Sequence, residues 1–185
     1  MNKSRFSVKS MAFTAIMAAV ICIGAPFCIP VPSGVPLSLA SFAVMLSGAL
    51  LGKTKGTLAV CLYILLGAVG LPVFSGFMGG VAPLVGLTGG FIVGYVPCAF
   101  VTGFFTERFS GKSYGVVAGM VLGSLLLYLV GTLWFVILTG SGIAEALLGC
   151  AVPFLLGDAV KIAAACVVAA ALRKKLTPII RDNKQ

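Results

Sequence analysis

Two ionisable residues stand three positions apart in an otherwise apolar stretch, Pro153-Phe-Leu-Leu-Gly157-Asp158-Ala-Val-Lys161. Residues three apart on a helix share a face, so Asp158 and Lys161 could contact each other or a shared ligand. A charge at bilayer depth costs about 3 kcal/mol, and such residues usually face the interior of a membrane protein and act on something. The pair therefore predicts a polar binding centre. A self-neutralising structural ion pair is the alternative interpretation.

Composition gives little support to chemistry beyond binding. The chain has 185 residues with four Asp or Glu, thirteen Lys or Arg and no histidine. This leaves almost nothing for acid–base catalysis or for a metal site, and the six cysteines form no CxxC pair. We expect no enzyme activity, no metal centre and no cofactor.

Two other segments carry polar groups that suit a small ligand. In Tyr128-x-x-Gly131-x-x-Trp134, a glycine leaves space between two aromatic rings with polar tips, as in the wall of a site for a small planar molecule. For Trp134, an interfacial aromatic belt is the alternative. Thr88 and Gly89 begin a further apolar segment, where a hydroxyl and free backbone N–H groups suit a carbonyl or carboxylate. Together these features predict one pocket in the outer half of a helix bundle.

The distribution of charge predicts the helices that position these groups. With 60% hydrophobic and 9% charged residues, the chain is excluded from the ordinary soluble class. Its uncharged runs, 10–52, 56–106 and 113–144, contain 43, 51 and 32 residues. A membrane-spanning helix needs about 20 apolar residues. The predicted spans are 11–29, 38–52, 56–71, 88–106, 114–138 and 147–172.

Basic residues set the orientation of this six-span arrangement. Twelve of the thirteen Lys and Arg fall at one side of it, and Lys161 is the one left over. By the positive-inside rule, both termini are cytoplasmic. We expect a single membrane domain over residues 1–185 with a basic cytoplasmic tail at 173–185. The net charge of +9 then serves topology and contact with the lipid bilayer, and predicts no nucleic-acid partner.

Two connections on the opposite side have unusual compositions. Residues 26–36 contain four prolines and cannot form a regular helix. Residues 70–90 contain seven glycines, yet also Phe74 and Phe77, whereas a flexible linker would be polar. Non-helical backbone near the membrane is tolerated where protein buries it or where it lines a cavity. We expect residues 70–88 to form a lid over the pocket, and a re-entrant turn without a ligand is the alternative.

Several linked motifs resemble the BioY family, the biotin-specific substrate-capture (S) components of energy-coupling factor (ECF) vitamin importers. The resemblance covers residues 10–172. It rests on Val35-Pro-Leu-Ser-Leu, Ser47-Gly-Ala-Leu-Leu-Gly52, Tyr63-x-x-x-Gly67-x-x-Gly70-Leu-Pro-Val-Phe74, Gly86-Leu-Thr-Gly-Gly90 and Pro153-Phe-x-x-Gly157-Asp-x-x-Lys161.

The resemblance implies an all-α integral membrane protein with six transmembrane helices, the S-component fold and a Gly-rich outer lid loop between the third and fourth helices. It implies a protein of the prokaryotic cytoplasmic membrane that captures biotin from outside. Partners would be a transmembrane coupling subunit and two ATPase subunits that hydrolyse ATP, and some members also occur as oligomers. Ala15 and Ala19 match the family's AxxxA docking contact for the coupling subunit, and release would follow a rigid-body tilt.

The Asp158/Lys161 pair and the loop before Thr88 match regions that hold biotin in the family, and from the chemistry of biotin we assign roles to the candidate site residues. Asp158 would accept hydrogen bonds from the ureido N–H groups of biotin, and Lys161 would orient Asp158 or donate to the ureido carbonyl. The rings would be flanked by Tyr128, Trp134, Phe74 and Phe77. The carboxylate tail would meet Thr88, Gly89 or Ser33.

Two positions depart from the family pattern, and three alternatives stay open. Ala40 stands where Gln is frequent, and Leu87 stands where Pro often precedes Thr-Gly-Gly, which affects the fine geometry of the pocket wall and the lid hinge. The chain could be an S component for thiamine or riboflavin, or a proton-coupled carrier that uses Asp158. It could also be a membrane interaction protein without transport activity.

Overall fold

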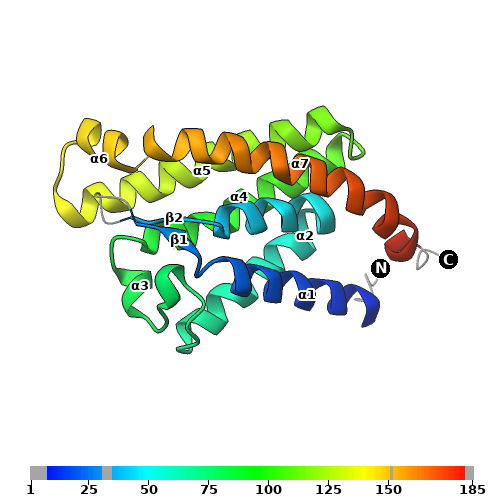
Figure 1. The fold of residues 1–185 in the computed structure, drawn as a ribbon, viewed down its shortest axis with the longest axis horizontal. Coiled ribbons are helices and arrows are strands. Elements are labelled where there is room, and N and C mark those ends of the chain that lie inside the picture. The colour runs from blue at the N-terminus through cyan, green and yellow to red at the C-terminus, as the bar shows by residue number, and fades with distance from the viewer. Residues whose placement is uncertain (1–7, 31–34, 151, 182–185) are drawn as a thin grey trace, which may run out of the picture.

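The computed structural model describes residues 8–30, 35–150 and 152–181, and most of them are helical (Figure 1). Helix α1 begins and α7 ends at one end of the molecule, whereas β1, β2, α3 and α6 lie toward the other. In the described part, α2, α4 and α5 are the helices long and apolar enough to cross a membrane. The elements are α1 (Val8–Gly24), β1 (Cys28–Ile29), β2 (Leu37–Ser38), α2 (Ala40–Ala68), the 3-10 turn η1 (Ser75–Phe77), α3 (Ala82–Val85), α4 (Gly89–Arg108), α5 (Ser113–Thr139), α6 (Ile143–Cys150) and α7 (Val152–Arg181).

The first helix ends earlier than the apolar pattern predicts. Helix α1 stops at Gly24 instead of residue 29. Pro26 follows within two residues, and proline lacks the N–H that a continuing helix would need. The next residues form a two-stranded antiparallel ladder, in which Cys28 pairs with Ser38 and Ile29 pairs with Leu37. This ladder was not expected for an all-α chain, and it places the start of α2 beside the end of α1.

Helix α2 contains two arms that fold back on each other at Gly52. The backbone there has φ 81° and ψ 180°, which interrupts the helix. The Ser47 hydroxyl approaches the Gly56 carbonyl oxygen at 3.3 Å. Residues nine apart in a straight helix would be about 13 Å apart along the axis, so the chain reverses direction between these two. The arms correspond to the predicted spans 38–52 and 56–71. The turn lies at Gly52, the predicted end of the first of these two spans.

The Glu107 carboxylate contacts the backbone at the Gly52 turn. The Glu107 Oε1 atom accepts a hydrogen bond from the Lys53 backbone N–H at 3.0 Å, which caps the start of the second arm. A Cβ atom at Gly52 would lie 2.2 Å from that same oxygen. A glycine is therefore required both for the positive φ and for the close approach of the carboxylate.

The last long helix extends beyond its predicted end. Instead of one span over 147–172, the structure has the short helix α6 followed by α7, which runs to Arg181. Proline 153 lies in the first turn of α7, where its missing N–H is tolerated. Residues 173–181, expected as a basic tail, are helical, and the segment begins with Arg173-Lys-Lys-Leu176, which are good helix formers. The change in charge marks the end of the apolar stretch and not the end of the helix.

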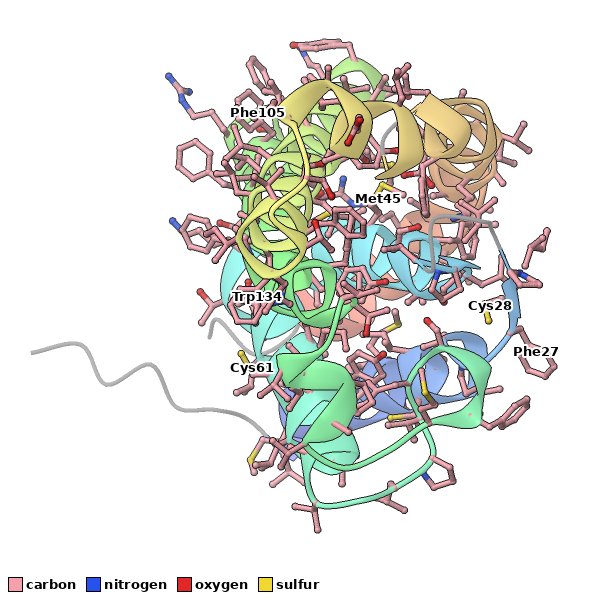
Figure 2. The ribbon with its side chains drawn as sticks, turned by 90° about the vertical axis from the view of Figure 1, so that its left-hand side faces the viewer. Phe27, Cys28, Met45, Cys61, Phe105 and Trp134 are labelled. Carbon is pink, nitrogen blue, oxygen red and sulfur yellow. The ribbon has the colours of Figure 1, made fainter. Side chains whose placement is uncertain are left out.

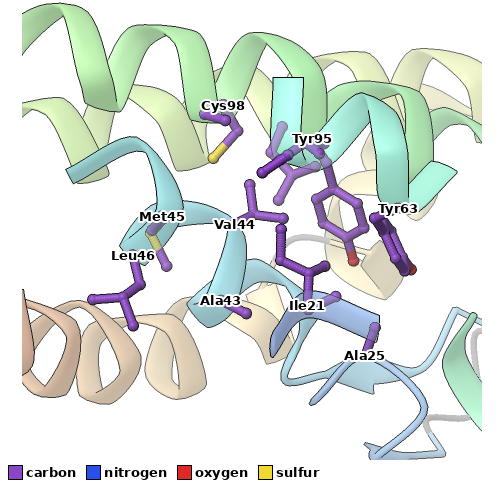
Figure 3. Close-up of a cluster of buried hydrophobic side chains, with 14 of the residues drawn as sticks. Ile21, Ala25, Ala43, Val44, Met45, Leu46, Tyr63, Tyr95 and Cys98 are labelled. Carbon is purple, nitrogen blue, oxygen red and sulfur yellow. The ribbon is translucent and has the colours of Figure 1, made fainter. Parts of the chain in front are cut away.

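The interior joins α1, both arms of α2 and α4 (Figure 3). Ile21, Val44 and Cys98 are fully buried there, and the rings of Tyr63 and Tyr95 approach each other at 6.5 Å between centroids. The outer surface of α5, by contrast, is covered by exposed leucines and an isoleucine, a pattern that suits contact with lipid. These residues are Leu122, Leu125, Leu126, Leu129, Leu133, Ile137 and Leu138.

A side chain at Gly56 is expected to destabilise the fold. In Gly56→Ala, the new Cβ atom would meet the Gly48 Cα and Ser47 O atoms at 2.8 Å, both backbone atoms of the opposing arm. Overpacking of this kind costs about 1–3 kcal/mol. Thermal unfolding in detergent, followed by circular dichroism, should show a lower midpoint. Gly24→Ala is the control, because nothing lies within 4 Å of its new Cβ atom; equal midpoints in the two variants would contradict the tight contact.

Candidate functional site

Asp158 and Lys161 form a buried ion pair on one face of α7. The Lys161 Nζ atom lies 3.0 Å from Asp158 Oδ1, and the side chains are 11% and 5% exposed. Their spacing of three residues brings them together, as the sequence predicted. Both side chains face a cavity inside the bundle, so the pair is in reach of a ligand.

Two serines near the start of α2 complete the polar cluster. The Lys161 Nζ atom donates to the Ser38 carbonyl oxygen at 2.7 Å and to the Ser41 hydroxyl at 3.0 Å. The Ser41 hydroxyl donates to Asp158 Oδ1 at 3.4 Å. Sequence reasoning missed both serines, since more than a hundred residues separate them from α7. The motif Val35-Pro-Leu-Ser-Leu was the only signal for this region.

Ser38 also holds the beginning of α2 against the end of α1. Its hydroxyl donates to the Ala25 carbonyl oxygen at 2.7 Å and accepts a hydrogen bond from the Ala40 N–H at 3.0 Å. One serine therefore fixes three chain segments, the β2 strand, the first turn of α2 and the last turn of α1. The Ser38 carbonyl that receives Lys161 is held in place by these contacts.

Helix α5 contributes Tyr128 to the same cluster. The Tyr128 hydroxyl donates a short hydrogen bond to Asp158 Oδ2. One turn later, a Cβ atom at Gly131 would lie within 2.6 Å of three carbons of the Phe91 ring, so this glycine permits α4 and α5 to pack closely. The two carboxylate oxygens of Asp158 thus accept from an ammonium group on one side and from a phenol on the other. A buried carboxylate with these partners is held in one orientation.

These side chains line a cavity inside the bundle. Its wall combines apolar and aromatic residues with hydroxyl groups. Of the wall residues, sequence reasoning missed the rings of Phe91, Tyr95 and Phe154. The full lining is Val35, Pro36, Ser38, Ser41, Ser75, Thr88, Phe91, Ile92, Tyr95, Leu127, Tyr128, Phe154, Asp158 and Lys161.

The two loop phenylalanines lie away from the cavity wall. Phe74 is 1% exposed and packs edge-on against Tyr63 at 5.6 Å between centroids. Phe77 is 61% exposed and packs edge-on against Phe27 at 5.8 Å. Ser75, between them, is the residue of η1 that lines the cavity. The two rings fix the loop to the bundle, and neither is placed to flank a ligand.

The start of α4 contributes Thr88, Phe91 and Ile92 to the lining. Thr88 lines the cavity, and its hydroxyl donates to the Pro83 carbonyl oxygen at 2.9 Å. Gly89 is buried, and a Cβ atom there would lie 1.9 Å from the Leu84 carbonyl oxygen. The Trp134 indole N–H donates to the Gly86 carbonyl oxygen at 3.0 Å, so this ring contacts the glycine-rich loop and is not part of the cavity lining. Figure 2 shows Trp134 to one side of the molecule, away from Phe27 at the opposite edge.

The remaining candidates lie elsewhere. Ala15 and Ala19 are exposed on α1 and form a surface separate from the cavity. Ser33 lies outside the described residues. No cluster of three or more Cys, Asp or Glu side chains occurs among the residues that the structure describes. The arrangement can therefore bind a small polar molecule through the Asp158 cluster and enclose it between aromatic walls.

Comparisons with known proteins agree with this interpretation. The model of the BioY family matches residues 1–178. A biotin transporter BioY from Thermotoga maritima is 39% identical over 168 residues, which cover 90% of this chain and 97% of the relative. A biotin transporter BioY from Rhodobacter capsulatus is 37% identical over 163 residues, covering 82% and 86%. The crystal structure of the S-component for biotin from an ECF-type ABC transporter is similar with a TM-score of 0.81 and 28% identity, and the match covers 94% of this chain and 95% of that chain.

Proposed function

This chain belongs to the BioY family, and from that premise we propose that its cavity captures biotin for uptake, as the S component of an ECF transporter. It is a transport protein and not an enzyme. The single observation that carries the proposal is the buried cluster of Asp158 with Lys161, Tyr128 and Ser41 at the cavity wall.

The cluster complements the ureido group of biotin. A ureido group presents two N–H donors and a carbonyl acceptor, and Asp158 offers a carboxylate that accepts such donors with charge assistance. Lys161, which also donates to the Ser38 carbonyl and the Ser41 hydroxyl, orients that carboxylate. Tyr128 stands at the same wall, and Phe91 and Tyr95 provide apolar area for the fused rings. Thr88 lies where the wall meets the glycine-rich loop, on the side assigned to the valeryl tail.

The helices support a six-span arrangement with both termini cytoplasmic. The two arms of α2 supply two of the spans, and α1, α4, α5 and α7 supply the others. Helix α1 begins and α7 ends at the same end of the molecule (Figure 1), and the sequence has basic residues at both of these helix ends. On this assignment residues 1–185 are one multi-pass domain in the prokaryotic cytoplasmic membrane, and biotin enters at the end that carries β1, β2 and α3.

The glycine-rich loop, residues 70–88, is the lid of the site in this proposal. Its Gly76 N–H donates to the Pro26 carbonyl oxygen at 2.9 Å, which joins it to the proline-rich connection after α1. The neighbouring ring contact of Phe27 with Phe77 reinforces this junction. Opening the site would break both contacts.

Removing one ring of that contact is expected to accelerate biotin release. Phe27→Ala deletes an aromatic pair worth about 0.5–1.5 kcal/mol, which corresponds to a 2- to 12-fold faster dissociation. Stopped-flow displacement of labelled biotin would measure the rate. Phe100→Ala, on the exposed face of α4, is the matched control. An unchanged rate for Phe27→Ala would show that this junction does not hold the site closed.

Transport in this proposal requires partners, a transmembrane coupling subunit and two ATPases. The exposed Ala15 and Ala19 stand one turn apart on α1 and permit close approach of a partner helix. Binding biotin concentrates it at the cavity, and the ATPases would supply the energy for release inside.

Calorimetric titration of the detergent-purified chain with biotin tests the proposal. One-to-one binding that thiamine and riboflavin do not compete would support it. Competition by either vitamin would favour the other S components. Uptake that collapses with a protonophore while ATP is preserved would favour the proton-coupled carrier.

A further inference from the structure

We propose that the cavity recognises the ring system of biotin and offers its carboxylate no charged partner, so that the protein also captures biotin amides, including biotin joined through an amide to a lysine side chain. This inference rests on the proposed function and specifies its substrate class.

The ammonium group in the cavity wall is fully engaged within the protein. An ammonium group has three hydrogens, and Lys161 has three acceptors, Asp158 Oδ1 at 3.0 Å, the Ser38 carbonyl at 2.7 Å and the Ser41 hydroxyl at 3.0 Å. A ligand carboxylate placed here would have to displace one of them. It would also stand beside the Asp158 carboxylate, and two like charges in one buried site are unfavourable.

Several donors at the loop side of the cavity are engaged as well, and the Ser75 and Tyr95 hydroxyls in the lining are uncharged donors that an amide oxygen can use as a carboxylate does. The Thr88 hydroxyl gives its hydrogen to the Pro83 carbonyl, so it can only accept a further hydrogen bond. The N–H groups of Phe91 and Ile92 donate to the Thr88 carbonyl at 3.1 and 3.0 Å, and that of Gly89 donates to the Gly86 carbonyl at 3.0 Å. These N–H groups, which sequence reasoning assigned to a carboxylate, are used by the turn that begins α4.

The sequence places no cation near this side of the site. Residues 56–107, which include the whole glycine-rich loop, contain no Lys or Arg, and neither does the connection 29–37. An amide in place of the carboxylate therefore loses no charged partner here. An amide also removes a negative charge from the neighbourhood of Asp158.

An open groove leads away from the cavity at Thr88. This residue lines both hollows, and the groove is bounded by the glycine-rich loop and α3. Its surface is mostly apolar and built of small residues, which suits the methylene chain of an extended tail. The other groove residues are Met78, Gly79, Ala82, Pro83, Gly86 and Leu87. A substituent on the carboxylate end would leave the cavity past Thr88 along this groove.

Competition against labelled biotin, with the full chain in detergent, tests the inference. The probes are biotin, biotin primary amide and biotin joined to lysine through the side-chain amine. Both amides should bind within about fivefold of biotin. Loss of a charge-assisted hydrogen bond would instead weaken them by a factor on the order of 10 to 100. A primary amide more than tenfold weaker than biotin would overturn the inference, because the carboxylate would then have a partner.

The longer probe tests the route out of the cavity. If the primary amide binds and the lysine conjugate does not, the tail ends against a closed wall. The claim that the protein captures biotin joined to a lysine side chain is then overturned. If biotin itself does not bind the folded chain, the proposed function fails instead. The two failures are therefore distinguishable.

A gain of selectivity provides a second readout. In Ser75→Arg, a guanidinium group is added to the loop side of the cavity, where we infer the carboxylate has no charged partner. This variant should prefer biotin over the primary amide by at least tenfold, and Ser75→Gln, of similar reach without charge, should retain the wild-type ratio. A wild-type chain that already prefers the acid as strongly as Ser75→Arg would contradict the inference.

Discussion

Replacing Asp158 with asparagine is expected to weaken biotin binding by about 100-fold. The variant keeps the size of the side chain but loses the charge that Lys161 and Tyr128 contact. Hydrogen bonds to a charged group contribute about 1.5–3 kcal/mol, a factor of about 10 to 150 in affinity. The remaining Lys161 ammonium would be buried without its counter-ion, which disturbs the cluster further. Isothermal titration of purified protein with biotin measures the loss.

A matched variant separates a local role from a general effect of charge. Glu145→Gln removes the charge of another acidic residue, on α6, where the side chain is exposed and outside the cavity lining. Its affinity for biotin should equal that of the wild type. Both variants must keep the wild-type circular dichroism spectrum and elution volume. Unchanged affinity in folded Asp158→Asn would rule out the ureido assignment and return the pair to a structural role.

Tyr128 gives a smaller and informative effect. Tyr128→Phe deletes the hydroxyl that donates to Asp158 Oδ2 and leaves the ring in place. One hydrogen bond of this kind would cost about tenfold in affinity. If Asp158→Asn and the double variant Asp158→Asn/Tyr128→Phe lose the same factor in biotin affinity, Tyr128 acts through the Asp158 carboxylate.

The contact between Asp158 and Lys161 could be predicted from the sequence because its signal is local. Asp158 and Lys161 are three residues apart, so helix geometry alone brings them together. Tyr128 was identified because a polar aromatic beside a glycine is unusual in an apolar segment. Ser41 and Tyr95, in contrast, carry no such local signal. Their positions at the wall depend on how α2 and α4 pack against α7, which charge and hydropathy patterns do not encode.

The loop shows where composition stops being informative. A glycine-rich segment with embedded aromatics correctly indicated a loop that packs against the bundle. It could not indicate which ring faces inward. Phe74 is buried against Tyr63, Phe77 points outward to Phe27, and Trp134 supports the loop instead of facing the cavity. These orientations are set by backbone turns such as the positive φ of Phe77, an uncommon conformation for a bulky residue that composition does not predict.

Replacing Ala15 with tryptophan is expected to abolish ATP-driven biotin uptake while biotin binding stays within twofold of the wild type. Ala15 and Ala19 are exposed on one face of α1, and the small side chains leave the helix backbone open to close approach by another helix. A tryptophan would hold a partner helix away. Uptake of labelled biotin by cells that produce the coupling subunit and ATPases should fall by at least 100-fold. Titration of the purified variant measures binding separately.

Control variants separate the effect of a large side chain from the effect of its position at Ala15. Leu129→Trp also adds an indole to an exposed surface, but on α5, where the neighbouring leucines suit contact with lipid. Uptake by this control should remain near the wild-type rate, and Ala15→Gly should retain uptake because it keeps the close approach possible. Loss of both binding and uptake in Ala15→Trp would point to a folding role for this face of α1. Equal uptake in Ala15→Trp and the wild type would place the coupling contact on another surface, since a bulky ring in a close helix–helix contact cannot be accommodated without separating the backbones.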